Sequence, residues 1–214
     1  MPEQALCGFG TWRDVRFWVA RAMTFNDLSS LSAYLASRRS GKPRDLAGPG
    51  PSMAQMTEMV SIAARTPDHG KLAPWRFIIV PDDKRQLLAD IITTAYFIEK
   101  PDAGRLEIEA QIQFATQAPA LIVVMSSPRE SKIPLWEQEL SAGAACMNLL
   151  HAVHALGFVG GWLTTWPAFN DSVRDAFGRP GEKIAGFIFI GTPSRELEER
   201  PRPELSEILS VWQG

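Results

Sequence analysis

The segment 65–75, RTPDHGKLAPW, holds more chemically active side chains than a turn between two apolar segments requires. Arg65 and His69 are donors that can reach carbonyl or phosphate oxygens of a bound cofactor. Pro67 lies between them and would restrict the backbone of the turn. The plainer interpretation is that Pro67 and Asp68 supply turn chemistry and that Trp75 begins a core strand. Taken alone, the segment favours the plainer interpretation.

A second cationic cluster, Arg38, Arg39 and Ser40, stands where the first helical pattern of the chain ends. Two guanidinium groups and a hydroxyl supply the forked donors that suit a phosphate monoester. The alternative is that the two arginines counter the negative end of the helix dipole. This cluster gains weight only in combination with the others.

The third group is the segment 160–164, GGWLT. Two glycines allow backbone to approach a flat ring closely, and Trp162 and Thr164 follow them. The alternative is a bulged strand with a buried tryptophan. The segment is not a G-x-G-x-x-G turn, so a Rossmann nucleotide site is not expected.

Other catalytic templates find no match in the chain. There is no G-x-S-x-G elbow, no P-loop and no H-E-x-x-H sequence. His151 and His154 are three residues apart and could ligate a metal together, but two histidines packed beside a core helix are the plainer interpretation. We therefore predict no metal site.

Composition sets the broad class. The chain has 214 residues, a formal net charge of −2 and two cysteines, Cys7 and Cys146. The near balance of charge gives no case for nucleic acid or an anionic membrane, and two cysteines exclude a disulfide framework and indicate a reducing, cytoplasmic location. No window approaches 18 apolar residues, so no membrane span is expected.

Apolar periodicity and turn residues predict an α/β mixture around one sheet. A helix starts from a cap at Asn26 or Asp27 and runs out at Arg38. Further helices are predicted over 52–65 (with Ser52 and Gln55 as a capping box), 83–98, 104–117, 134–156 and 170–177, buried strands over 76–80, 120–125 and 184–191, and an irregular strand or loop over 158–166.

The two ends of the chain differ from this pattern. Residues 1–25 are predicted to be an extension, either disordered with Met23 as the real start or carrying a short amphipathic helix, and residues 26–214 form a single domain. The tail after Thr192 is charged and rich in proline, yet ends in Ile208, Leu209 and Trp212. We expect its apolar end to dock against another surface.

In this order, the Arg38–Ser40 cluster, the Arg65–His69 segment with Pro74 and Trp75 behind it, and Gly160–Trp162 resemble the nitroreductase family of FMN-dependent oxidoreductases, in particular its small single-domain branch. The resemblance extends over residues 28–203 and is strengthened by further matches at Trp136–Glu139, Ser141–Gly143, Gly186–Phe187 and Gly191–Pro193.

The resemblance implies an α+β, nitroreductase-like fold, with a central, mostly antiparallel sheet flanked by helices and a C-terminal arm that reaches the dimer partner. It implies a homodimer with FMN at the subunit interface and with NADH or NADPH as electron donor. FMN would pass hydride in a ping-pong cycle to nitroaromatic, quinone or similar electron-poor acceptors, so the protein need not supply a nucleophile or an acid–base pair. The alternative is a flavin-binding storage or sensing protein without productive turnover.

Site residues follow from the same resemblance. Arg38, Arg39 and Ser40 would hold the FMN phosphate and ribityl chain, and Arg65 and His69 would reach FMN from the neighbouring subunit. The remaining expected contacts are Trp162, Leu163 and Thr164 against the isoalloxazine ring, Arg200 or Arg202 at the phosphate, and Ala152, Val153, His154, Ala155, Leu156 and Gly157 at NAD(P). Leu163 stands where relatives can carry a basic residue, which puts a charged contact there in doubt.

Overall fold

The computed structural model describes residues 24–214, so the predicted extension over residues 1–25 lies outside the described part except for its last two residues. The chain divides into two compact units, which meet in sequence between Arg38 and Arg39. In the first unit, helix α1 is Leu31–Ser37 and its cap is Ser30, three or four residues after the predicted cap at Asn26 or Asp27, so that prediction is wrong. Ser30 caps the helix through a hydrogen bond from the Ala33 amide, which leaves the preceding residues in turns.

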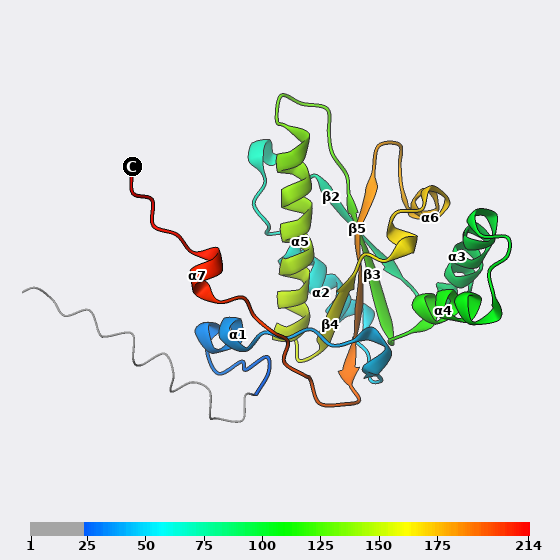
Figure 1. Ribbon diagram of the computed structural model, residues 1–214, viewed down its shortest axis with the longest axis horizontal. Helices are drawn as coiled ribbons and strands as arrows, with labels where there is room; N and C mark the ends of the chain where they lie inside the picture. The colour runs from blue at the N-terminus through cyan, green and yellow to red at the C-terminus, as the bar shows by residue number, and fades with distance from the viewer. Residues whose placement is uncertain (1–23) are drawn as a thin grey trace, which may run out of the picture. The chain divides into compact units, whose positions relative to one another are not determined.

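The second unit, residues 39–214, is built on a five-stranded sheet (Figure 1). Its strands are β1 (Leu46–Ala47), β2 (Trp75–Val80), β3 (Ala120–Ser126), β4 (Val159–Leu163) and β5 (Lys183–Pro193). The order is β1-β5-β3-β2, β4 also pairs with β5, and every pairing is antiparallel. The predicted α+β fold with a mostly antiparallel sheet is confirmed.

Helices cover both faces of this sheet, as Figure 1 shows. One face carries α2 (Met53–Ala63) and α5 (Leu135–Ala155), and the other carries α3 (Arg85–Glu99), α4 (Arg105–Thr116) and α6 (Asp171–Phe177). Strand β3 is buried along its whole length because alternate residues serve the two faces. Ile122 and Val124 join the core under α5, whereas Leu121 and Val123 join the core under α3 and α4.

Most predicted elements lie within a few residues of the observed ones because their signals are local. Ser52 and Gln55 form both hydrogen bonds of the predicted capping box. Gly157 ends α5 with a φ of 83°, a conformation that glycine adopts without strain. The short β1 and the single 3-10 turns η2 (Pro43–Asp45), η3 (His69–Lys71), η4 (Asp82–Lys84) and η5 (Trp166–Ala168), and the four-residue helix α7 (Leu205–Ile208), were not predicted. Among the described residues no helix is both long and apolar enough to cross a membrane.

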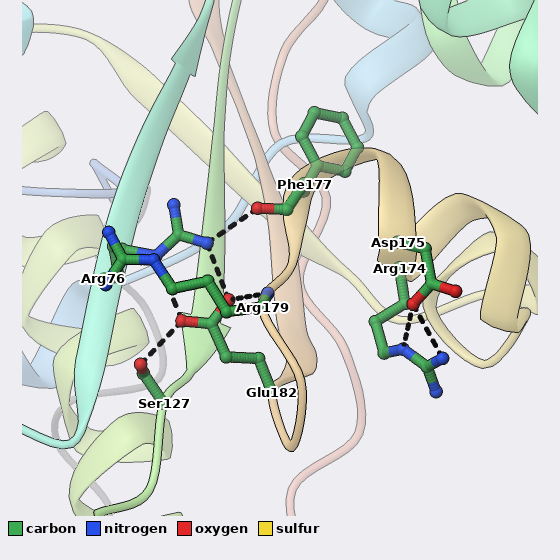
Figure 2. A network of polar contacts seen from close by, with 7 residues as sticks. All are labelled: Arg76, Ser127, Arg174, Asp175, Phe177, Arg179 and Glu182. Carbon is green, nitrogen blue, oxygen red and sulfur yellow. Dashed lines mark hydrogen bonds and ion pairs between the residues drawn. The ribbon is translucent and has the colours of Figure 1, made fainter.

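A buried ion pair fixes the start of β5 (Figure 2). The Glu182 side chain is only 3% exposed and accepts two hydrogen bonds from Arg76, at 3.0 and 2.6 Å. It also accepts from the Ser127 hydroxyl (2.6 Å) and the Arg179 amide (2.7 Å). Burial raises the pKa of this carboxyl, but the hydrogen bonds from Arg76, Ser127 and Arg179 outweigh burial and lower the pKa to about 2. The network ties the turn before β5 to β2 and β3.

Candidate functional site

Three polar side chains on one face of α5 hold the loop 65–75. The pairs are Asn148 Nδ2 with Thr66 Oγ1 (2.7 Å), Ser141 Oγ with the Pro67 carbonyl (3.0 Å) and Glu137 Oε2 with His69 Nδ1 (2.8 Å). Positions 137, 141 and 148 recur at intervals of four and seven residues, which places them along one side of a helix. We call these three residues the α5 ladder. No local pattern in the loop pointed to them.

The α5 ladder holds the loop through the Thr66 hydroxyl, the Pro67 carbonyl and the His69 ring. The His69 side chain is 64% exposed, and Arg65 is exposed and its guanidinium makes no hydrogen bond or ion pair with any residue of the described part. Gly70 and Lys71 next to His69 have φ values of 82° and 55°. Both predicted donors are therefore exposed to solvent, on a loop whose position is fixed by contacts with α5.

The segment that carries Arg39 and Ser40 lies directly against β4. The Gly41 amide donates to the Gly160 carbonyl (3.1 Å), and a Cβ on Gly161 would lie 2.7 Å from the Gly41 carbonyl oxygen. Only glycine fits at such a distance from another backbone. The structure therefore joins two of the predicted groups, the arginine–serine segment and the double glycine.

A pocket of about 90 Å³ opens beside this contact. Its lining carries four basic side chains, Arg39, Lys42, Arg44 and Arg195, with Ser40 between them, and three acidic ones, Asp45, Glu196 and Glu198. The tail crosses it: Lys42 pairs with Glu198 (2.8 Å), and the Arg39 Nε donates to the Glu198 carbonyl. Of the residues predicted for the phosphate site, Arg39 and Ser40 line this pocket.

The basic residues of this pocket differ in part from the predicted ones. Lys42, Arg44 and Arg195 were missed, although the first two follow Ser40 closely in sequence. Arg200 and Arg202 lie farther along the tail, are exposed and do not line the pocket, and Arg202 pairs with Glu199 (3.0 Å). Arg38 is the C-cap residue of α1 and belongs to the first unit.

Trp162 is the second-last residue of β4, and its side chain lies on the neighbouring strand β5. Its indole Nε1 donates to the Ala185 carbonyl (3.0 Å), and a Cβ on Gly186 would lie 2.0 Å from that nitrogen. The tryptophan is 36% exposed, so part of its ring faces solvent. Leu163 packs against the core under α3 and α4, and Thr164 is exposed.

The stretch expected to contact NAD(P) is half buried. Ala152, Val153 and His154 are at most 1% exposed, and the His154 Nε2 accepts a hydrogen bond from the Gly160 amide (3.4 Å). Ala155 and Gly157 are exposed and Leu156 is partly so. Contact with a nicotinamide cofactor there stays a prediction for the exposed end. The described residues hold no group of three or more His, Cys, Asp or Glu side chains suited to a metal.

One chain does not bring the loop and the basic pocket together. His69 contacts the first turn of α5, whereas the pocket includes Gly41, whose amide bonds Gly160, a residue that follows the last turn. With a rise of 1.5 Å per residue, the helix between these points is roughly 28 Å long. A single small cofactor therefore cannot touch His69 and Arg39 of the same chain.

Comparisons with known proteins identify the family of the chain. The model of the family described as "Nitroreductase family" matches residues 35–192. The chain is 34% identical over 161 residues to the Escherichia coli K12 protein named "Putative NAD(P)H nitroreductase YdjA", covering 74% of this chain and 86% of that protein.

Solved structures share the fold. A nitroreductase-like family protein from Bacillus cereus superposes with a TM-score of 0.73 at 20% identity, over 87% of this chain and 97% of the other. A nitroreductase with bound FMN from Bacteroides fragilis superposes with a TM-score of 0.62 at 16% identity, over 84% and 96%. Together with the sequence matches, these likenesses show that the chain belongs to the nitroreductase family of oxidoreductase enzymes.

Proposed function

We propose that this protein is an FMN-dependent NAD(P)H oxidoreductase that works as a homodimer. The observation that carries the proposal is the backbone contact between Gly41 and Gly160–Gly161, because it places a basic pocket next to the strand end that bears Trp162. A phosphorylated planar cofactor needs these two features side by side. The curated relative is named for NAD(P)H, and the solved structure from B. fragilis is named for bound FMN.

The pocket suits the phosphate end of FMN. Arg39 and Arg195 offer guanidinium groups, Ser40 offers a hydroxyl, and Lys42 and Arg44 add positive charge. Its volume of about 90 Å³ is well below the roughly 300–1,000 Å³ of complete ligand sites. The pocket would therefore hold one end of the cofactor, and Arg38 at the phosphate stays a prediction.

Trp162, Leu163 and Thr164 are the proposed neighbours of the isoalloxazine ring. When bound, FMN supplies the hydride and electron transfer, so the chain's own residues bind, orient and exclude water. The fixed indole of Trp162 offers a flat apolar surface, and exposed Thr164 offers a hydroxyl. No side chain is assigned to acid–base catalysis.

The rest of the site would come from a second copy of the chain, whose Arg65 and His69 reach the cofactor. An apolar stripe on α5 supports the dimer: Trp136 and Leu140 are 62% and 59% exposed, and the small residues Gly143 and Ala144 continue it at helical spacing. The tail is a second unpartnered apolar segment, with Leu205, Ile208, Leu209, Val211 and Trp212 exposed. We propose that the tail docks on the partner subunit.

NADH or NADPH would deliver hydride first and leave, and a nitroaromatic, quinone or similar electron-poor acceptor would take the same place in a ping-pong cycle. Such an enzyme fits a reducing, cytoplasmic location, in line with the low cysteine content. A flavin-binding storage or sensing protein is the alternative function. It shares the cofactor site and lacks turnover.

Three measurements test the proposal: flavin colour, sedimentation and anaerobic reduction. Purified protein should be yellow or turn yellow with added FMN, and sedimentation should show a dimer. Protein that is colourless after incubation with FMN and removal of the unbound flavin would refute the cofactor assignment. Anaerobic NADH or NADPH should bleach the flavin, and a nitroaromatic or quinone should restore the colour. Flavin that both nicotinamides leave oxidised would instead support storage or sensing.

A further inference from the structure

We propose that Glu137 is a positioning residue that decides which ring nitrogen of His69 faces the cofactor. The inference rests on the proposed function, in which His69 reaches the FMN of the partner subunit. Glu137 would touch neither FMN nor substrate, and would act only through the His69 ring.

The geometry of the pair fixes the proton on the ring. Glu137 Oε2 lies 2.8 Å from His69 Nδ1, a hydrogen-bond distance. An ionised carboxylate can only accept, so Nδ1 must be the donor and must carry a proton. Nε2 is then the ring nitrogen left for the ligand, and in the neutral ring it carries no proton. It would therefore accept a hydrogen bond from an N–H or O–H group of FMN, rather than donate to an oxygen as the sequence suggested. In water a neutral histidine ring mostly keeps its proton on Nε2, so the carboxylate selects the other tautomer.

The other two contacts of the α5 ladder hold the loop independently of Glu137, so the effect of Glu137 on the His69 ring can be measured apart from any effect on folding. Ser141 holds the Pro67 carbonyl and Asn148 holds Thr66, and both Ser141 and Thr66 are buried. These contacts keep the main chain of the loop in place without Glu137. A change at position 137 should therefore free the His69 ring and leave the loop where it is.

Glu137 could instead serve only the helix, because it lies in the first turn of α5 and a carboxylate there stabilises the helix dipole. Glu139 is a matched control for general effects of removing a charge from this end of the helix. Its exposure is similar (38% against 33%), and its partner is Lys183 (2.8 Å), on β5. Only Glu137 contacts the histidine.

The first experiment reads the ring directly and needs no flavin. Histidine-selective ¹⁵N labelling gives three residues to resolve, His69, His151 and His154, and H69A assigns the first. At alkaline pH, wild-type protein and E139Q should show His69 protonated on Nδ1. E137Q should lose that preference, because an amide can donate as well as accept. Identical His69 spectra in wild type and E137Q would overturn the inference.

The second experiment is a double-mutant cycle on FMN affinity. E137Q should weaken FMN binding roughly 2- to 5-fold, as expected for loss of a partly exposed hydrogen bond to a carboxylate, and E139Q should not. In the H69A background the E137Q change should have no further effect, because its route to the cofactor is gone. An equal loss in both backgrounds would show a structural role only. Wild-type protein that binds no FMN would refute the proposed function, while the ring spectra still decide the role of Glu137.

Discussion

Replacing Gly161 with alanine tests the contact on which the proposed cofactor site depends. The new Cβ would lie 2.7 Å from the Gly41 carbonyl oxygen and 3.1 Å from two ring carbons of Pro43. The nearest obstacle is backbone and both glycines are buried, so no flexible side-chain end can move aside. The segment that carries Arg39 must shift away from β4.

The expected cost follows from two terms. Overpacking of this kind costs about 1–3 kcal/mol, and loss of the hydrogen bond between Gly41 and Gly160 adds about 0.5–1.5 kcal/mol. We expect G161A to lower the free energy of unfolding by about 2–4 kcal/mol, which for a chain of this size lowers Tm by roughly 5–15 °C. FMN affinity should fall as well, because Arg39 and Ser40 move with Gly41.

Thermal unfolding with and without FMN, and a flavin titration, measure both effects. G104A is the matched control. Gly104 has an ordinary φ of −75°, and the nearest atom to a Cβ there is 3.9 Å away. Only the helix cap changes, so the expected cost in unfolding free energy is below about 1 kcal/mol. G161A with a Tm within about 2 °C of wild type and unchanged FMN affinity would refute the argument, since the close approach would then carry no constraint.

Three further predictions concern β5 and the tail. E182Q should lower the free energy of unfolding by about 3 kcal/mol at neutral pH, because the pKa of Glu182 is lowered to about 2 in the folded protein. Because the pKa of Glu182 is lower in the folded protein, its carboxylate stabilises the fold fully above the ordinary value of 4.5. Denaturant titrations should therefore show the difference in unfolding free energy between wild type and E182Q shrinking as pH falls from 4.5 toward 2. A difference that does not change with pH would contradict this. R195A should weaken FMN binding about 10-fold, and R200A, outside the pocket, should have little effect; equal losses would argue against Arg195. G186A should displace the Trp162 indole and weaken FMN binding, and an unchanged near-ultraviolet circular dichroism spectrum would show that the indole has stayed.

The fold was predictable to the extent that its signals are local. The apolar run of β3 and the capping box of α2 depend on neighbouring residues, and both were predicted correctly. The start of α1 was placed too early because several polar residues in a row can cap a helix. Strand β1 was missed since two residues carry no periodicity, and the strand exists only because β5 extends far enough to pair with it.

The sequence by itself determined which residue types are available to a phosphorylated ring, and in which order. Arg39 with Ser40, Arg65 with His69 and the double glycine before Trp162 could be picked out one by one. Only the tertiary structure decided that Gly161 meets Gly41, that Arg195 rather than a later tail arginine lines the pocket, and that three residues of α5 hold the loop. These contacts join residues far apart in the chain. They depend on strand register and on which side of a helix faces a loop, and no short stretch of sequence specifies either.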